Sequence, residues 1–400
     1  PGQIAALVSL KHLRHPAIRQ AAWKALDQPD ADVHAAALAA LILSGTADDV
    51  PALIALTKNE GDAAFETLRL MPAEGINGAL IAWMDQAKDL PAVAVQSALS
   101  RRSPDFIPAF LRAAESSDGA ARVEAFKALE IMGTEKEAPA LAVLLSKTPS
   151  GEERELAGRA VWMSCQKIAE PEERSAPLLA AMAKGNGEAQ CAALPTLARI
   201  GGQEALPAVR KAMQSTDQAV RDAGYRALAN WPDATVADEL LEIAKTSDVD
   251  SYRVWSLRAY ARVVALPSER PAQKTFEMLR DAMKLANRYE EKELFVSRLT
   301  AVRVPDSLEL LLSFVDDARL KAAAVPAVFT LAKGLSQSHA DQAAAALKKI
   351  QPMTQDAALL QQIPKVLRDI DARKPVSNTH LTLPTTKPRC RTRWSPEQEK

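Results

Sequence analysis

Apolar residues recur along most of the chain with the three- and four-residue spacing of amphipathic helices. Residues 121–133 show the pattern clearly, with one apolar stripe made of Val123, Ala125, Phe126, Ala128, Leu129 and Ile131. Residues 220–231 repeat it with Val220, Ala223, Ala227 and Leu228, with Tyr225 beside them. This spacing places the apolar side chains on one face of each helix and predicts that this face packs against a neighbouring helix.

Two kinds of predicted helix alternate along the chain. The first, which we call B, follows an acidic residue or a glycine; examples start at Asp30, Gly61, Asp118, Gly151, Asn186, Asp217 and Asp250. The second, called A, has a proline in its first turn, as in Val50-Pro51, Ile107-Pro108, Ala138-Pro139, Ala176-Pro177 and Leu206-Pro207. Proline is tolerated there because the first helical N–H groups have no partner within the helix.

The B helices start about 27 to 38 residues apart, which is one helix pair per step and lies within the range of solenoid repeats. One such pair cannot bury its apolar face alone, whereas stacked pairs can. The sequence therefore predicts an all-α array of about eleven helix pairs over residues 1–375.

The recurring motif Asp-x-x-Val-Arg-x-x-Ala-x-x-Ala-Leu, seen at Asp217, Val220, Arg221, Ala227 and Leu228, resembles the HEAT repeat of the short bacterial kind found in phycobilisome lyases. The resemblance covers roughly residues 16–370. It implies a right-handed α–α superhelix of the HEAT or armadillo type. It also implies a non-catalytic scaffold that binds a protein partner, and we expect a monomer.

The segment Tyr252–Arg258, followed by Arg270-Pro271 and Glu277–Leu279, is similar to HEAT segments of large bacterial proteins that carry a carbohydrate-active or redox domain elsewhere. A non-catalytic segment of such a secreted enzyme is therefore one alternative to a free-standing scaffold. A nucleic-acid-binding HEAT-like protein is the other.

Charge disfavours the nucleic-acid alternative. The chain has 50 basic and 50 acidic residues, and the last 25 residues hold five of the former and two of the latter. Residues 1–375 therefore carry a formal net charge of −3, without the basic bias of nucleic-acid-binding proteins.

Motifs of catalysis are missing from the sequence. It has no P-loop, no GxSxG and no HExxH, and His12 and His15 precede Pro16 at an expected helix end, which favours a surface or capping role over a metal site. Cys165 and Cys191 are expected to be free thiols on helices. We therefore predict no catalytic residue, no cofactor and no metal, and the sequence does not identify the binding residues.

The recurring Asp and Arg residues of the B helices have a structural interpretation. We expect each Asp to cap a helix and each Arg to reach the neighbouring repeat; the pairs are Asp118/Arg122, Asp217/Arg221 and Asp250/Arg253. The five tryptophans of residues 1–375 are expected to pack in the core or between repeats, and one exposed on the inner face would mark a binding site; they are Trp23, Trp83, Trp162, Trp231 and Trp255.

The ends of the chain differ from the repeats. Residues 376–400 have no helical periodicity and resemble translated sequencing-adapter read-through, so we exclude them from the fold; the alternative is a basic interaction tail around Arg389, Arg391 and Arg393. On the first interpretation, the natural protein continues beyond residue 375. The chain begins Pro1-Gly2 without Met, so we expect a missing N-terminus, and the compartment stays open between cytoplasm and export. No apolar run is long enough to span a membrane.

Overall fold

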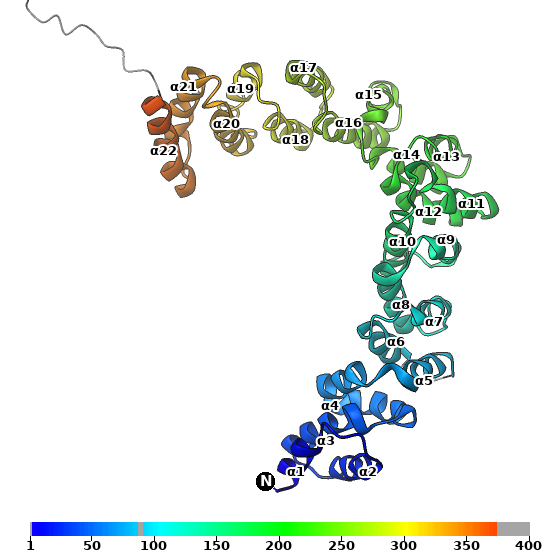
Figure 1. The fold of residues 1–400 in the computed structure, drawn as a ribbon. Helices are drawn as coiled ribbons and strands as arrows, with labels where there is room; N and C mark the ends of the chain where they lie inside the picture. The colour runs from blue at the N-terminus through cyan, green and yellow to red at the C-terminus, as the bar shows by residue number, and fades with distance from the viewer. Residues whose placement is uncertain (1, 87–90, 374–400) are drawn as a thin grey trace, which may run out of the picture. The chain divides into compact units, whose positions relative to one another are not determined.

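A computed structural model describes residues 2–86 and 91–373 of the chain (Figure 1). These residues form 22 α-helices and six short 3-10 helices, and no strand is found among them. The predicted all-α fold is confirmed. Residues 376–400, expected to be a separate tail, lie outside the described residues.

The chain divides into two compact units. Unit 1 contains Pro1–Glu269 and Met278–Leu294, and unit 2 contains Arg270–Glu277 and Phe295–Lys400. The boundary passes through two helices, α17 and α18, whose bounds are given below. Each unit is described by itself.

The helices alternate between the two predicted kinds. The B helices are α1 (Gly2–Leu10), α3 (Ala31–Ser44), α6 (Pro91–Ser100), α8 (Gly119–Met132), α10 (Glu152–Cys165), α12 (Gly187–Ile200), α14 (Gln218–Ala229), α16 (Asp250–Val264), α18 (Tyr289–Leu299), α20 (Lys321–Leu335) and α22 (Ala357–Arg373). The A helices are α2 (Pro16–Ala25), α5 (Ala73–Gln86), α7 (Ile107–Ala113), α9 (Ala138–Lys147), α11 (Ala176–Lys184), α13 (Leu206–Met213), α15 (Ala237–Thr246), α17 (Ala272–Met283), α19 (Pro305–Leu312) and α21 (Ala340–Ile350).

The remaining helix, α4 (Val50–Leu70), contains one helix of each kind. Gly61 has φ +43° and ψ −117° and interrupts it, and this backbone conformation favours glycine. The A part precedes Gly61 and the B part follows it, at the place where the sequence pattern starts a B helix. Counting α4 as one pair gives eleven consecutive A–B pairs from α2 to α22 in the described chain.

Within unit 1, the B helices form a continuous row. Each of α6, α8, α10, α12, α14 and α16 packs against the next, and the A helices α7, α9, α11, α13 and α15 lie on the other side of this row (Figure 1). The B helices consequently share one exposed face, opposite the A helices. We call it the B face.

Two of the three expected capping residues, Asp118 and Asp217, are confirmed. The carboxylate of Asp118 accepts a hydrogen bond from the backbone N–H of Ala121, and Asp30 and Asp217 cap α3 and α14 in the same way. Asp250 is different. The cap position of α16 is Val249, so Asp250 is the first helical residue and pairs with Arg253 and Arg288.

Of the three arginines expected to reach the neighbouring repeat, Arg122 forms an ion pair there, whereas Arg253 pairs with Asp250 of its own helix. The guanidinium of Arg122 pairs with Glu153 of the next B helix (2.6 Å), and Arg154 of α10 reaches Glu188 of α12 (3.3 Å). Arg221 donates to the carbonyl of Ser215 in its own repeat (2.6 Å). These pairs support the interpretation that the recurring charges of the B helices are structural.

One position of the predicted apolar stripe in α8 is wrong. Phe126 and Leu129 are buried, but Ile131 is 48 % exposed. At 100° per residue, Ile131 lies close to Lys127, one turn before it, and away from Leu129. Ile131 is therefore an apolar residue on the B face.

Close backbone contact joins α13 to α14. A Cβ atom placed on Gly224 would lie 2.7 Å from the backbone nitrogen of Met213 and 2.9 Å from the backbone carbon of Ala212. Neither backbone atom can move without shifting α13. Gly224 therefore sets the distance between these two helices.

Gly224→Ala is expected to destabilise unit 1 by roughly 1–3 kcal/mol, since the added methyl group overpacks a backbone contact. Urea unfolding followed by circular dichroism measures this change. Gly78→Ala is the matched control: its Cβ would meet no atom within 4 Å, and alanine is the better helix former by about 1 kcal/mol. Equal effects of the two substitutions would contradict the assigned contact.

Candidate functional site

Of the histidine and cysteine residues singled out in the sequence, one caps a helix and two are wholly or partly buried. The side chain of His15 accepts a hydrogen bond from the backbone N–H of Ala17 and caps α2, as expected for a capping role. Cys165 is buried, and burial raises the pKa of its thiol to about 12. Cys191 is half-buried, and burial followed by the charge of Asp217 raises its pKa. Both are free thiols and poor nucleophiles at neutral pH.

In residues 2–86 and 91–373, no group of three or more His, Cys, Asp or Glu side chains is arranged to hold a metal ion. Within the same ranges, no helix combines the length and the apolar character needed to cross a bilayer.

A row of cations crosses the B face of unit 1. Four B helices carry an exposed basic residue directly before a buried Ala and a second buried apolar residue; the four are Lys127 in α8, Arg159 in α10, Arg226 in α14 and Arg258 in α16. Because the buried pair fixes the rotation of each helix, the four cations occupy the same register of the repeat. We call them the cation ladder.

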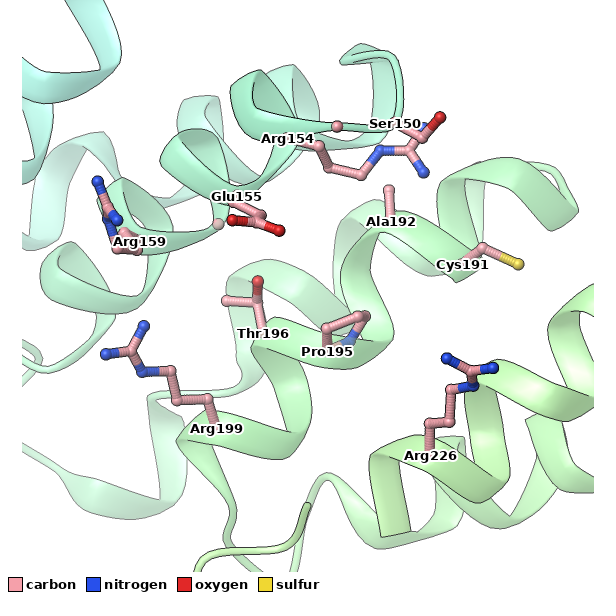
Figure 2. Close-up of a pocket in the computed structure, with 12 residues that line it drawn as sticks. Ser150, Arg154, Glu155, Arg159, Cys191, Ala192, Pro195, Thr196, Arg199 and Arg226 are labelled. Atoms are coloured by element: carbon pink, nitrogen blue, oxygen red, sulfur yellow. The ribbon is translucent and has the colours of Figure 1, made fainter. Parts of the chain in front are cut away.

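Helix α12 interrupts the cation ladder. The residue at the ladder position is Pro195, which precedes the buried residues Thr196 and Leu197. Its ring is short, so a groove of about 740 Å³ opens here between α10, α12 and α14 (Figure 2). Small residues also line the groove, including Gly158 and Ala192.

Arginine side chains surround this groove. Arg159, Arg199 and Arg226 lie around Pro195 and Thr196 in Figure 2, and Arg154 lies at another edge. Glu155 is the acidic residue of the groove lining. The groove is therefore electropositive on balance.

Two of these arginines are held by tryptophan rings of neighbouring B helices. The guanidinium carbon of Arg199 lies 4.0 Å from the ring centre of Trp162 in α10, and that of Arg226 lies 4.5 Å from the ring centre of Trp255 in α16. Such contacts restrict the side chains while leaving the guanidinium N–H groups free to donate. Because Arg199 leans toward α10 and Arg226 toward α16, they leave the groove between them open.

The basic side chains of the groove and of the cation ladder differ in whether a carboxylate forms an ion pair with them. Arg159 pairs with Glu130 (3.2 Å) and Lys127 with Glu124 (2.8 Å). Among the described residues, by contrast, no ion pair joins a carboxylate to Arg199, Arg226 or Arg258. These three guanidinium groups are therefore available to an external anion.

Pro195 also changes the backbone hydrogen bonding of α12. It has no N–H, so the carbonyl of Cys191, four residues earlier in α12, lacks its usual donor within the helix. Cys191 and Pro195 both line the groove. Pro195 therefore leaves one backbone carbonyl of α12 without its usual donor at the level of the groove.

The structure places three of the tryptophans in the core or between repeats, as the sequence predicts. Trp231 is completely buried, and Trp162 and Trp255 are half-buried and pack between repeats through the two arginines. The binding residues themselves were missed by the sequence analysis. The signal that could have found them is the basic residue before each buried Ala-apolar pair.

Comparisons with known proteins agree with this architecture. The family of HEAT repeats matches residues 78–162 and 175–261. A search of curated proteins finds no match. Among solved structures, Kap121p has a similar fold, with a TM-score of 0.56 at 12 % identity over 88 % of this chain. The karyopherin Kap121p bound to the extreme C-terminus of the protein phosphatase Cdc14p gives a TM-score of 0.56 at 13 % identity over 90 % of this chain.

This chain covers 45 % of each Kap121p chain, less than half its length. At this level of identity, the likeness concerns the fold. Together with the family match and the eleven helix pairs, it shows that the chain is an all-helical solenoid of the HEAT type, with HEAT repeats in residues 78–162 and 175–261.

Proposed function

We propose that this chain is a non-catalytic scaffold and that the B face of unit 1 binds a protein partner. The observation that carries the proposal is the set of exposed guanidinium groups without a carboxylate partner, Arg199, Arg226 and Arg258. Two of them are held in place by tryptophan rings. Arginine and tryptophan are the residue types most enriched at the energetic centres of protein interfaces.

The charge distribution supports a specific surface. The whole chain has a formal net charge of zero, whereas the B face from α8 to α16 carries the cation ladder. A local concentration of one sign of charge attracts and orients a partner of the opposite sign. In this proposal, the scaffold acts as a monomer of the short bacterial HEAT type.

A solved structure of similar fold offers an analogy. Kap121p is recorded with the C-terminus of Cdc14p bound to it, so a solenoid of this fold can hold a segment of another protein. The analogy supports a protein ligand for this chain and does not identify it.

Binding of single-stranded nucleic acid is a weaker proposal. Such binding uses aromatic rings on which bases stack. The rings of Trp162 and Trp255 are half-buried, and each already has a guanidinium over one face. These contacts favour a protein partner over base stacking.

Site-specific photocrosslinking tests the proposed surface. A photoreactive phenylalanine derivative at Ile131 in α8 should form adducts with a defined protein in an extract of the source cells. Val143 in α9 is the matched control, since Ile131 and Val143 are both aliphatic and 48 % and 42 % exposed, but Val143 belongs to an A helix. Equal adducts from both positions, none from Ile131, or adducts with nucleic acid would contradict the proposal.

A further inference from the structure

We infer that the B face binds an extended acidic segment of the partner, whose carboxylates lie three residues apart on either side of one uncharged side chain. This inference rests on the proposed function, because it names the part of the partner that the B face would hold. The spacing of the cation ladder, the gap at Pro195 and the charges around that gap favour such a segment.

The spacing follows from helix packing. Neighbouring packed helices lie about 8–10 Å apart, and the cation ladder has one position per B helix. An extended chain advances about 3.3–3.6 Å per residue. Three residues of extended chain therefore match one step of the cation ladder.

The gap at Pro195 defines the centre of the segment. Two ladder cations, Lys127 and Arg159, lie on one side of it, and Arg226 and Arg258 lie on the other. A segment in register would place carboxylates at its first, fourth, tenth and thirteenth positions. This pattern reads the same in both chain directions, so the match does not depend on the direction of binding.

The seventh position of the segment would enter the groove. The groove has space for a side chain because the ladder residue is proline and because Arg199 and Arg226 lean apart. Glu155 lines the same groove and would repel a carboxylate there. An uncharged apolar side chain, packed on Pro195 and Ala192, therefore suits the centre.

The two halves of the ladder are not equivalent. Arg226 and Arg258 have no carboxylate partner to give up, whereas Lys127 and Arg159 must exchange Glu124 and Glu130 for the ligand. Exposed ion pairs of this kind are weak, so exchange is feasible. We expect the α14–α16 half to contribute more to affinity.

A synthetic peptide tests the inference. The probe is a fluorescent thirteen-residue peptide with Glu at positions one, four, ten and thirteen, Leu at position seven, and Ser and Gly elsewhere. The comparator has the same composition with the four Glu residues contiguous. A thirteen-nucleotide oligothymidylate tests a nucleic-acid ligand. Binding to the full chain is measured by fluorescence anisotropy at low ionic strength, because salt screens such contacts.

The spaced peptide should bind about tenfold more tightly than the comparator, a difference equivalent to losing one or two of the matched contacts. Arg226→Glu and Arg258→Glu should each weaken its binding by about tenfold. Lys211→Glu, an equal charge change on an exposed residue of the A helix α13, should leave binding unchanged. Circular dichroism confirms that each variant is folded.

The outcomes separate the inference from the proposed function. Equal affinity for the two peptides, tighter binding of the oligothymidylate, or equal effects of Arg258→Glu and Lys211→Glu would each overturn the inference. The proposed function would still stand if crosslinking at Ile131 captured a protein. If that crosslinking also failed, the proposed function would fail with it.

Discussion

Trp231→Ala should lower the free energy of unfolding of unit 1 by about 3–5 kcal/mol, the range for removal of a large buried side chain. Trp231 follows the end of α14 and is completely buried. Its carbonyl accepts a hydrogen bond from Arg262 of α16 (2.6 Å). The loss should be largest in the two repeats formed by α13 to α16, because each repeat of a solenoid contacts only its neighbours.

Urea unfolding and amide hydrogen exchange measure the size and the location of this effect. Trp255→Ala is the matched control, since Trp255 is a tryptophan of the same part of the row but is only half-buried. It should cost less, on the order of 1 kcal/mol, from loss of the contact with Arg226. Equal costs for the two substitutions, or uniform loss of protection along unit 1, would contradict this packing.

Asp49→Ala should have the second-largest effect, about 3 kcal/mol, since it leaves the partners of a buried carboxylate unpaired. Asp49 is 3 % exposed. Its carboxylate accepts two hydrogen bonds from the guanidinium of Arg19 (2.7 and 2.6 Å), one from the indole of Trp23 (2.8 Å) and one from the backbone N–H of Thr46 (2.7 Å). Asp49 thus joins α2 to the 3-10 helix η1 (Ala47–Asp49) before α4. Asp49→Asn, of equal size but uncharged, should cost less.

The contribution of Asp49 should depend on pH. Burial raises the pKa of its carboxyl, but the hydrogen bonds from Arg19, Thr46 and Trp23 lower it more, so the pKa lies below the ordinary value of 3.8. A lowered pKa stabilises the fold above the pKa of the unfolded carboxyl, and this stabilisation is lost as the pH falls through the lower folded value. The difference between wild type and Asp49→Ala should therefore be constant from pH 5 to 7 and shrink below about pH 4. A difference that grows on acidification would contradict the assigned contacts.

Much of the fold was predictable from the sequence because its signals repeat. Proline in the first turn marks the A helices, as at Pro108 of α7, and Asp118 and Asp217 mark the starts of B helices by capping them. Even the interruption of α4 falls at Gly61, where the sequence pattern starts a B helix. Whether a single apolar residue at the edge of a helix face is buried or exposed was less predictable. Ile131 extends the apolar pattern of α8 but lies outside the buried face.

The candidate site was not predictable from any one helix. An exposed Lys or Arg such as Arg258 is ordinary on the surface of a helix, and the net charge of the chain hides a local excess. The cation ladder becomes visible only when the buried Ala-apolar pairs are aligned. The groove further depends on Pro195 and on the directions of Arg199 and Arg226, which are set by tryptophans of other repeats and have no local sequence signal.

A charge-swap cycle is the most direct test of the proposed binding surface. Wild type and Arg226→Glu are each titrated with three peptides. The first is the spaced acidic peptide, the second has Lys as its tenth residue, and the third has Lys as its fourth residue. Both Lys versions are needed because Arg226 faces the tenth residue in one direction of binding and the fourth residue in the other. We predict that Arg226→Glu weakens the acidic peptide and that one Lys version restores most of the lost affinity. If neither version recovers affinity, or if the same recovery occurs with Lys211→Glu, the carboxylates do not contact the cation ladder and this account of the B face is wrong.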